Sequence, residues 1–329
     1  MIAQSYLGGI RKIDFWPTLL VGVLAIDTVI SLVLKPTFGP VAYGTIVYFL
    51  LLLLSTGFAL RNAAQRTLGR RMFWMFMAGG YGLWALDQWL YLYYGVGLRT
   101  DVPDSSLADP ALFLHIVPLM AAVAMRPHVR RSNQKPSRAS LNFLLLLFFW
   151  AFLYAYLLLP YQYLFANATI YNPRFTYLYG VENTALVVAL GVLTFRAQKP
   201  WKSVYVHFLG ASALYGVSST FANIAIDSGW QYNGSIYSLA QTAAVCWFVW
   251  VPLRARQVRA EVMPTELDAG RAGFTSLLAR LAVIAIPVIG MLELFRIHES
   301  PGTRTFRLCV VLASVLLLAM AVSLKEYLA

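Results

Sequence analysis

Ten long apolar runs divide this chain of 329 residues and constrain its fold more than any other feature. About 20 consecutive apolar residues cross the hydrocarbon core of a bilayer as a helix. The runs cover Trp16–Leu34, Val41–Leu60, Met72–Tyr94, Leu107–Met125, Leu141–Tyr163, Phe175–Phe195, Val204–Ile226, Ser235–Pro252, Phe274–Phe295 and Phe306–Leu324. The chain has no long alternation of apolar and polar residues of the kind that a membrane β-barrel requires. The sequence therefore predicts an all-α bundle of about ten transmembrane helices.

The composition excludes a soluble enzyme. Hydrophobic residues make up 59% of the chain and charged residues only 12%, whereas soluble globular proteins are about 45–50% apolar and 25% charged. The net charge of +12 would indicate nucleic acid as the partner of a soluble protein. Because the positive charge lies in short connections between apolar runs, we expect the lipid bilayer as the partner and no nucleic acid.

The Lys and Arg residues give an orientation. The two termini and the connections on their side hold 19 of these residues, whereas the connections on the other side hold 6, with Arg307 counted in the last of them. Cytoplasmic segments of membrane proteins carry the excess of Lys and Arg. A missed span would disturb this alternation. The pattern predicts ten spans with both termini in the cytoplasm, and we expect the protein in a bacterial inner membrane.

The longest cytoplasmic connection divides the chain into unequal parts. We expect an eight-span bundle over residues 1–255, a linker over 256–272, and a two-span terminal hairpin over 273–329. The last helix has no Gly or Pro stop signal before Ala329. An output domain beyond this point and an ordinary chain end both fit that observation.

Polar side chains within the apolar runs gather at one expected depth. Counted at 1.5 Å per residue from the outer ends of the runs, several of them lie about 10 Å into the membrane. Ionisable residues at membrane depth usually face a cavity or a partner. We expect a small ligand to bind among Asp87, His115, Glu182, Asn183, Asn223, Asp227 and Gln241, with Trp84, Trp150 and Tyr154 as walls; Asp27 lies at the same depth, but the sequence does not fix which way it faces.

Other interpretations of these polar groups stay open. They could serve only to hydrogen-bond helices to one another. Asp87, His115 and Glu182 could supply ligands to a metal ion, but the sequence lacks the HxxxH and ExxH spacings, so we expect no metal. No Lys lies inside a run to form a Schiff base with retinal. Cys246 and Cys309 have no neighbouring ligand at CxxC spacing, and we expect no cofactor.

Three functions fit such a bundle. The first is a sensory or receptor-like module that passes ligand binding to its last helix. The second is a secondary transporter in which carboxylates couple protons, although we find no internal repeat. The third is a membrane enzyme for a lipid-soluble substrate, with Asp87 and Glu182 as general acid and base. No catalytic motif is present, so we expect no enzyme.

Several stretches resemble the membrane-embedded input region of bacterial sensor histidine kinases and GGDEF diguanylate cyclases. The resemblance extends over roughly residues 70–255 and the terminal hairpin. It rests on Leu86–Tyr91, Phe113–Met120, Arg126–His128, Pro160–Tyr163, Tyr177–Tyr179 with Glu182, and Ala222–Asp227.

The resemblance implies an input module that signals through its last helix to a cytoplasmic output domain or partner. This sequence contains no PAS, kinase or GGDEF segment, so the resemblance carries over no catalytic residue and assigns no ligand. A homodimer is compatible with such a module. We therefore expect a sensory membrane protein of bacterial signal transduction.

Overall fold

The computed structural model describes residues 15–35, 37–64, 68–103, 106–127, 136–198, 201–227, 234–257, 284–293 and 300–327. The part of the chain in these ranges is helical and contains no strand, which confirms the all-α fold class. The expected linker from residue 258 onward and the first part of the terminal hairpin, to residue 283, lie outside the described ranges.

The helices follow the apolar runs. They are α1 (Phe15–Val33), α2 (Phe38–Ala64), α3 (Leu68–Tyr91), η1 (Leu92–Leu98), α4 (Ala108–Leu114), α5 (Ile116–Met125), α6 (Pro136–Leu157), η2 (Pro160–Leu164), α7 (Ala168–Arg196), α8 (Trp201–Asp227), α9 (Ile236–Gln257), a helix over Ile284–Glu293, and α11 (Pro301–Tyr327). The segments η1 and η2 are π-helices.

Seven of these helices are long and apolar enough to cross a membrane. They are Phe15–Val33, Phe38–Ala64, Ala108–Met125, Ala168–Arg196, Trp201–Ile226, Ile236–Arg256 and Pro301–Met320. Two shorter apolar helices, Phe143–Leu157 and Ile284–Glu293, accompany them. Large apolar side chains face outward along the described helices, including Phe195, Val29 and Leu312. A helix satisfies its own backbone hydrogen bonds and can therefore present such side chains to lipid. The chain is thus a multi-pass helical membrane protein.

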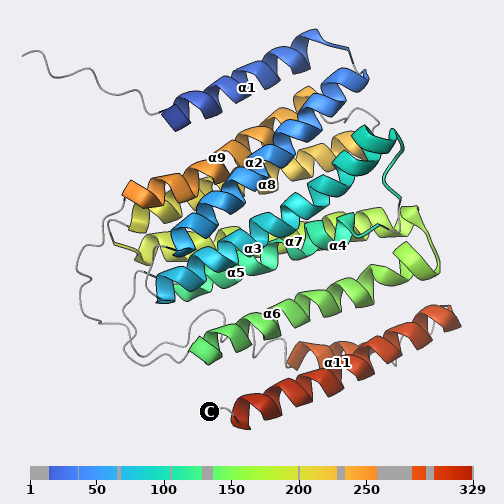
Figure 1. The fold of residues 1–329 in the computed structure, drawn as a ribbon. Helices are drawn as coiled ribbons and strands as arrows, with labels where there is room; N and C mark the ends of the chain where they lie inside the picture. The colour runs from blue at the N-terminus through green and yellow to red at the C-terminus, as the bar shows by residue number, and fades with distance from the viewer. Residues whose placement is uncertain are drawn as a thin grey trace, which may run out of the picture.

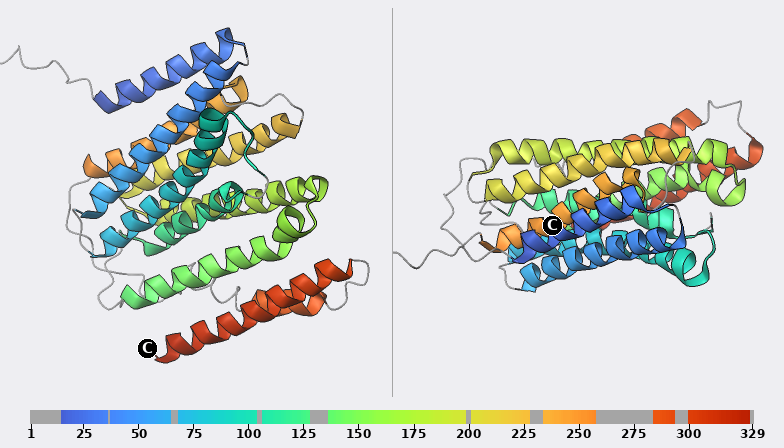
Figure 2. Two further views of the ribbon diagram at one scale, coloured as in Figure 1. Left: turned by 45° about the vertical axis from the view of Figure 1, so that its right-hand side comes forward. Right: turned by 90° about the horizontal axis from the view of Figure 1, so that it is seen from above.

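The helices lie side by side in one bundle (Figure 1). Helices α2, α3, α5, α7, α8 and α9 pack against one another, and α1 lies at one edge against α9. At the other edge, α6 separates these helices from α11 and the helix Ile284–Glu293 (Figures 1 and 2). We call these last two helices the terminal hairpin. The start of α1 and the end of α11 lie at one end of the bundle (Figure 1), which we call the terminus end, and the opposite end the far end.

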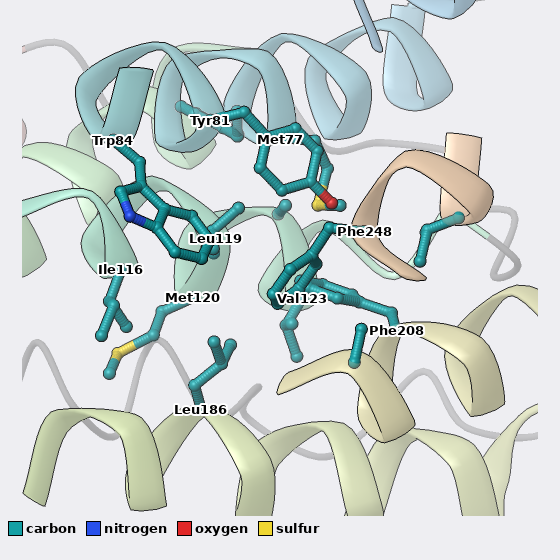
Figure 3. Packing of buried hydrophobic residues seen from close by; sticks show 14 of the residues in the cluster. Met77, Tyr81, Trp84, Ile116, Leu119, Met120, Val123, Leu186, Phe208 and Phe248 are labelled. Atoms are coloured by element: carbon teal, nitrogen blue, oxygen red, sulfur yellow. The ribbon is translucent and has the colours of Figure 1, made fainter. Parts of the chain in front are cut away.

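The core consists of large aromatic and aliphatic side chains. Trp84, Tyr81, Phe248 and Phe208 are fully buried and belong to one cluster with Leu119 of α5, which fills the space between α3 and α7 (Figure 3). Helices α3 and α5 approach closely at Gly80, where an added Cβ would lie 2.6 Å from a Leu119 Cδ atom. Small residues permit such contacts between helices in membranes.

The expected span over Leu107–Met125 is interrupted at His115, between α4 and α5. Pro118 explains the interruption, because proline has no N–H to donate to the carbonyl oxygen of Leu114, four residues earlier. Helix α7 begins at Ala168, seven residues before the expected Phe175, and continues through Pro173.

Candidate functional site: a buried acid and tyrosine centre

Trp84 lies at the centre of a cluster of rings from several helices. Its ring stacks on His115 at 4.7 Å between centroids and meets Tyr215 of α8 edge-on at 4.4 Å. Tyr48 of α2 and Phe248 of α9 make further edge contacts at 5.8 and 5.7 Å. Edge-to-face pairs of this kind stabilise a core beyond the burial of their area. The cluster therefore joins α2, α3, α8 and α9 to the junction of α4 and α5.

His115 is held in one orientation. It is buried, and its Nδ1 hydrogen-bonds the carbonyl oxygen of Leu112. Because a carbonyl oxygen can only accept, Nδ1 donates in this bond. The helix interruption at Pro118 thus places the imidazole of His115 against the face of Trp84.

Two tyrosines connect α7 and α8 beside this cluster. The hydroxyl groups of Tyr179 and Tyr215 are hydrogen-bonded at 2.7 Å, and Tyr179 lies 6.2 Å from His115 between ring centroids. Asn183, one of the predicted site residues, donates from Nδ2 to the carbonyl oxygen of Tyr179 at 2.9 Å. The Asn183 side chain therefore makes a hydrogen bond within α7, to the backbone one turn earlier.

Two carboxyl groups are buried near these rings. The side chain of Asp87 is 0% exposed, and its Oδ2 accepts a hydrogen bond from Gln88 at 2.9 Å. Glu182 is also 0% exposed. Within the described part of the chain, Asp87 Oδ1 and both carboxylate oxygens of Glu182 have no hydrogen-bond partner. Unpaired polar groups are costly to bury, so such groups mark this region as a candidate site.

A second polar network lies at the far end of the bundle. The hydroxyl of Tyr154 donates to Oε1 of Gln162 at 2.6 Å and lies 3.3 Å from the hydroxyl of Tyr171. Tyr171 donates in turn to Oδ2 of Asp109 at 2.7 Å. We call these four residues the Asp109–Tyr154 network. It joins α4, α6, η2 and α7, and Phe113 packs between Tyr154 and Phe175 at its edge.

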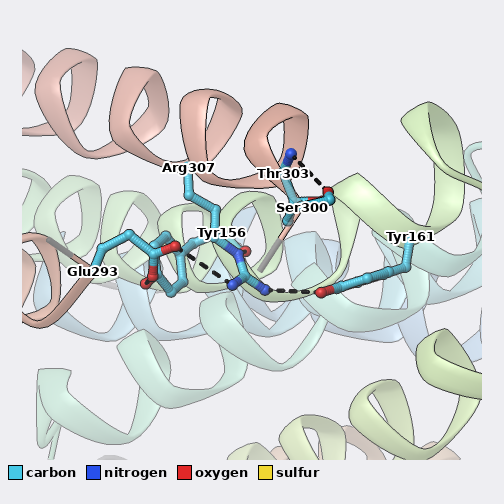
Figure 4. A network of polar contacts seen from close by, with 6 residues as sticks. All are labelled: Tyr156, Tyr161, Glu293, Ser300, Thr303 and Arg307. Carbon is cyan, nitrogen blue, oxygen red and sulfur yellow. Dashed lines mark hydrogen bonds and ion pairs between the residues drawn. The ribbon is translucent and has the colours of Figure 1, made fainter. Parts of the chain in front are cut away.

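A third network attaches the terminal hairpin to α6 (Figure 4). Arg307 and Glu293 are both fully buried and form an ion pair at 3.7 Å. Arg307 donates from Nε to the carbonyl oxygen of Tyr156 at 3.1 Å and from Nη2 to the hydroxyl of Tyr161 at 3.3 Å. The Tyr156 hydroxyl donates to Glu293, and the guanidinium lies over the Tyr156 ring at 5.0 Å. The expectation that Arg307 belongs to an outer connection is wrong, because it lies in α11 and is buried.

The other predicted residues lie around these networks. Trp150 is buried and meets Phe113 edge-on at 6.0 Å. Asn223 is half-buried and donates to Oγ1 of Thr176 at 3.4 Å, which links α8 to α7.

Two predicted positions lie on the α9 side of the bundle. Asp27 is buried in α1 beside Thr242 of α9, and Gln241 is half-buried at the preceding position. Asp227 ends α8, and its side chain lies outside the described part of the structure.

The structure thus brings Trp84, His115 and Asn183 around the Tyr179–Tyr215 pair, and Asp87 and Glu182 lie three residues along α3 and α7 from Trp84 and Tyr179. It places Tyr154 in the Asp109–Tyr154 network, and it places Asn223 and Gln241 at helix contacts. In the described ranges, no group of three or more His, Cys, Asp or Glu side chains could hold a metal ion.

Sequence reasoning missed Tyr215, its pairing with Tyr179, and Arg307. Tyr179 falls in one of the stretches that carry the resemblance, but nothing in the sequence indicates that its hydroxyl group bonds Tyr215. Arg307 did offer a sequence signal, because it begins the last run while the acidic Glu293 ends the run before it.

Comparison with protein-family models, with curated proteins and with solved structures found no match to this chain.

Proposed function

We propose that this protein is a sensory, receptor-like module of a bacterial inner membrane. A small ligand binds in the outer half, at the centre formed by Trp84, Asp87, His115 and Glu182, and binding shifts α6 and the terminal hairpin. The ten apolar runs cross the membrane, and the terminus end of the bundle faces the cytoplasm. The 19 cationic residues on that side support this orientation.

The observation that carries the proposal is the position of α6 between the core and the terminal hairpin. On one side, Tyr154 bonds Gln162 and contacts Phe113 of the core. On the other side, Tyr156 bonds Glu293 and Arg307. A ligand shifts a conformational equilibrium only through different affinities for two arrangements. Helix α6 is the element through which such a difference would reach α11.

The end of α11 is where a signal would leave the membrane. Under this proposal, it connects to a cytoplasmic output domain or contacts a signalling partner, and the module works as a monomer or as a homodimer. The buried pair of Arg307 and Glu293 supports a rigid connection, because such a pair holds one geometry and is strongly destabilised when one partner is lost.

The native cysteines offer a direct test. Cys309 is exposed on α11, whereas Cys246 is buried, so a fluorescent label on the full chain in liposomes attaches to Cys309. A set of small molecules is screened for those that raise the thermal unfolding midpoint, and each such compound is then added to the labelled protein. We expect it to change the emission of the label, and we expect Asp87→Asn and Glu182→Gln to abolish that response.

The same compounds distinguish the alternative functions. A secondary transporter would move the radiolabelled compound into liposomes, and a membrane enzyme would convert it to a product. Transport or turnover without any response at Cys309 would contradict the sensory function.

A further inference from the structure

Tyr161 of η2 contacts two arginines from other helices. The guanidinium carbon of Arg174 of α7 lies over its ring, 4.5 Å from the ring centroid. Arg307 of α11 donates to its hydroxyl at 3.3 Å (Figure 4), and the guanidinium carbon of Arg307 lies 5.8 Å from the same centroid. Two guanidinium groups therefore share one phenol ring where η2, α7 and α11 meet.

The two arginines differ in their partners. Glu293 pairs with Arg307 at 3.7 Å. Arg174 is half-buried and has neither a carboxylate nor a hydrogen-bond acceptor among the described residues. Asp109 accepts from Tyr171, one turn before Arg174, and forms no ion pair with Arg174 in the described structure. Stacking uses the flat face of a guanidinium group and leaves the N–H groups at its edge able to donate, so Arg174 presents unused donors beside a second cation.

Arg174 lies at the expected boundary of the hydrocarbon core. It directly precedes the apolar run Phe175–Phe195, and Arg196 directly follows that run. At 1.5 Å per residue, the helix between the two arginines is about 33 Å long, close to the ~30 Å thickness of the core. Arg174 is therefore at the depth of lipid headgroups, at the far end of the bundle, where α7 begins (Figure 1).

An exposed apolar stripe runs along α7 from Arg174. Its members recur with the period of an α-helix counted from Arg174, so they share one helix face with it. They are Tyr177, Val181, Val188 and Val192. Thr184 lies on the same face, and its hydroxyl is satisfied within the helix by the carbonyl oxygen of Gly180 at 2.8 Å. We call this surface the α7 stripe, and it can hold an acyl chain whose headgroup lies at Arg174.

We propose that Arg174 binds the phosphate group of an anionic phospholipid from the leaflet at the far end, with an acyl chain along the α7 stripe. Two N–H groups at the edge of a guanidinium match two phosphate oxygens. The negative headgroup offsets the repulsion between Arg174 and Arg307 around the Tyr161 ring, so it also favours the bond from Arg307 to Tyr161. The inference is independent of the proposed sensory function and of the buried centre.

Native mass spectrometry of the full chain, freed of lipid in detergent, tests the site. Phosphatidylglycerol and phosphatidylcholine with the same acyl chains are titrated separately, and the dissociation constant of the first bound lipid is measured for each. We expect the wild-type protein to bind phosphatidylglycerol more tightly. Arg174→Gln should weaken that binding by about tenfold or more, because it removes a charge-assisted bidentate contact. Arg174→Lys keeps the charge without the planar donor edge and should fall between the two.

Arg196→Gln is the matched control. It removes an exposed arginine from the other end of α7 and should leave the binding of phosphatidylglycerol unchanged. The thermal unfolding midpoint of each lipid-free variant verifies that the fold is retained. Phosphatidylglycerol should raise the midpoint of the wild-type protein more than that of Arg174→Gln.

Three results would overturn the proposal. Equal losses of affinity in Arg174→Gln and Arg196→Gln would indicate diffuse attraction of anionic lipid to a cationic protein. Equal binding of the two lipids by the wild-type protein would remove the role of headgroup charge. Inorganic phosphate that raises the wild-type midpoint as much as phosphatidylglycerol does would indicate an ion site without a lipid.

Discussion

Tyr154 and Tyr156 lie two residues apart on α6 and serve opposite sides of that helix. Two residues turn an α-helix by about 200°, so the Tyr154 hydroxyl donates to Gln162 in the bundle while the Tyr156 hydroxyl donates to Glu293 in the terminal hairpin. The adjacent residues Tyr161 and Gln162 of η2 repeat the arrangement, with Tyr161 accepting from Arg307. The core and the terminal hairpin are therefore joined through two short segments.

The buried ion pair should dominate attachment of the terminal hairpin. Arg307→Met leaves Glu293 buried without its cation, and such a loss costs about 3–5 kcal/mol. We expect a large decrease in the free energy of unfolding, measured by denaturant titration in detergent. Leu312→Ala, which is 62% exposed on the same helix, should have little effect. A change below about 1 kcal/mol in Arg307→Met would fall within the range of a surface salt bridge and would refute the attachment.

The contact between α3 and α5 should tolerate no side chain at position 80. Gly80→Ala places a Cβ 2.6 Å from Leu119 and 2.9 Å from the carbonyl oxygen of His115. Overpacking of this kind costs about 1–3 kcal/mol, so we expect a lower thermal unfolding midpoint. Gly82→Ala is the control on the same helix, because its Cβ would lie 4.0 Å from Thr56. Equal unfolding midpoints for the two variants would show that α5 can move away from the added methyl group at no cost, and would contradict the prediction.

Removal of the unpaired carboxyl group should stabilise the protein. Glu182→Met keeps a similar volume and deletes two buried oxygens that have no partner in the described structure. We expect the free energy of unfolding to rise by about 1–3 kcal/mol, because a lone polar group is no longer buried. Functional sites often carry such a stability cost.

Asp109→Leu serves as the comparison for that variant. It removes a carboxylate that accepts from Tyr171 at 2.7 Å, and it should lower stability. If Glu182→Met also lowers stability, the Glu182 carboxyl group has a stabilising partner and is not the unpaired group described here.

The hydroxyl group of Tyr171 should contribute to the stability of the fold. Tyr171→Phe breaks the hydrogen bond to Asp109 and the contact with Tyr154, so the half-buried Asp109 carboxylate loses a donor. We expect a loss of about 1–3 kcal/mol in unfolding free energy. Tyr177→Phe on the same helix, where the side chain is 75% exposed, should stay within about 0.5 kcal/mol of the wild-type value.

The apolar runs predict the helices because length and hydropathy suffice to identify a helix that satisfies its own backbone in lipid. They do not predict the rotation of each helix about its axis. For this reason, Trp84 and His115 could be expected near one another, whereas the pairing of Asn223 with Thr176 could not.

Depth alone also cannot identify partners across the bundle. Arg307 follows a connection and carries charge, both of which are typical of a solvent-exposed residue. Its burial depends on Glu293 and Tyr156 from other segments, which no local pattern contains. The hydrogen bond between Tyr179 and Tyr215 is likewise a property of two helices packed together.

The central claim is that the core and the terminal hairpin are coupled through α6, and a double-mutant cycle tests it most directly. Tyr154→Phe changes the core side of α6, Glu293→Gln changes the hairpin side, and unfolding free energies are measured for both single variants and for the double variant. We predict a coupling energy of about 0.5 kcal/mol or more, whereas independent sites add to within about 0.3–0.5 kcal/mol. Tyr154→Phe combined with Leu312→Ala should be additive. If the changes in unfolding free energy of Tyr154→Phe and Glu293→Gln are also additive, the claim that α6 couples the core to the terminal hairpin is contradicted.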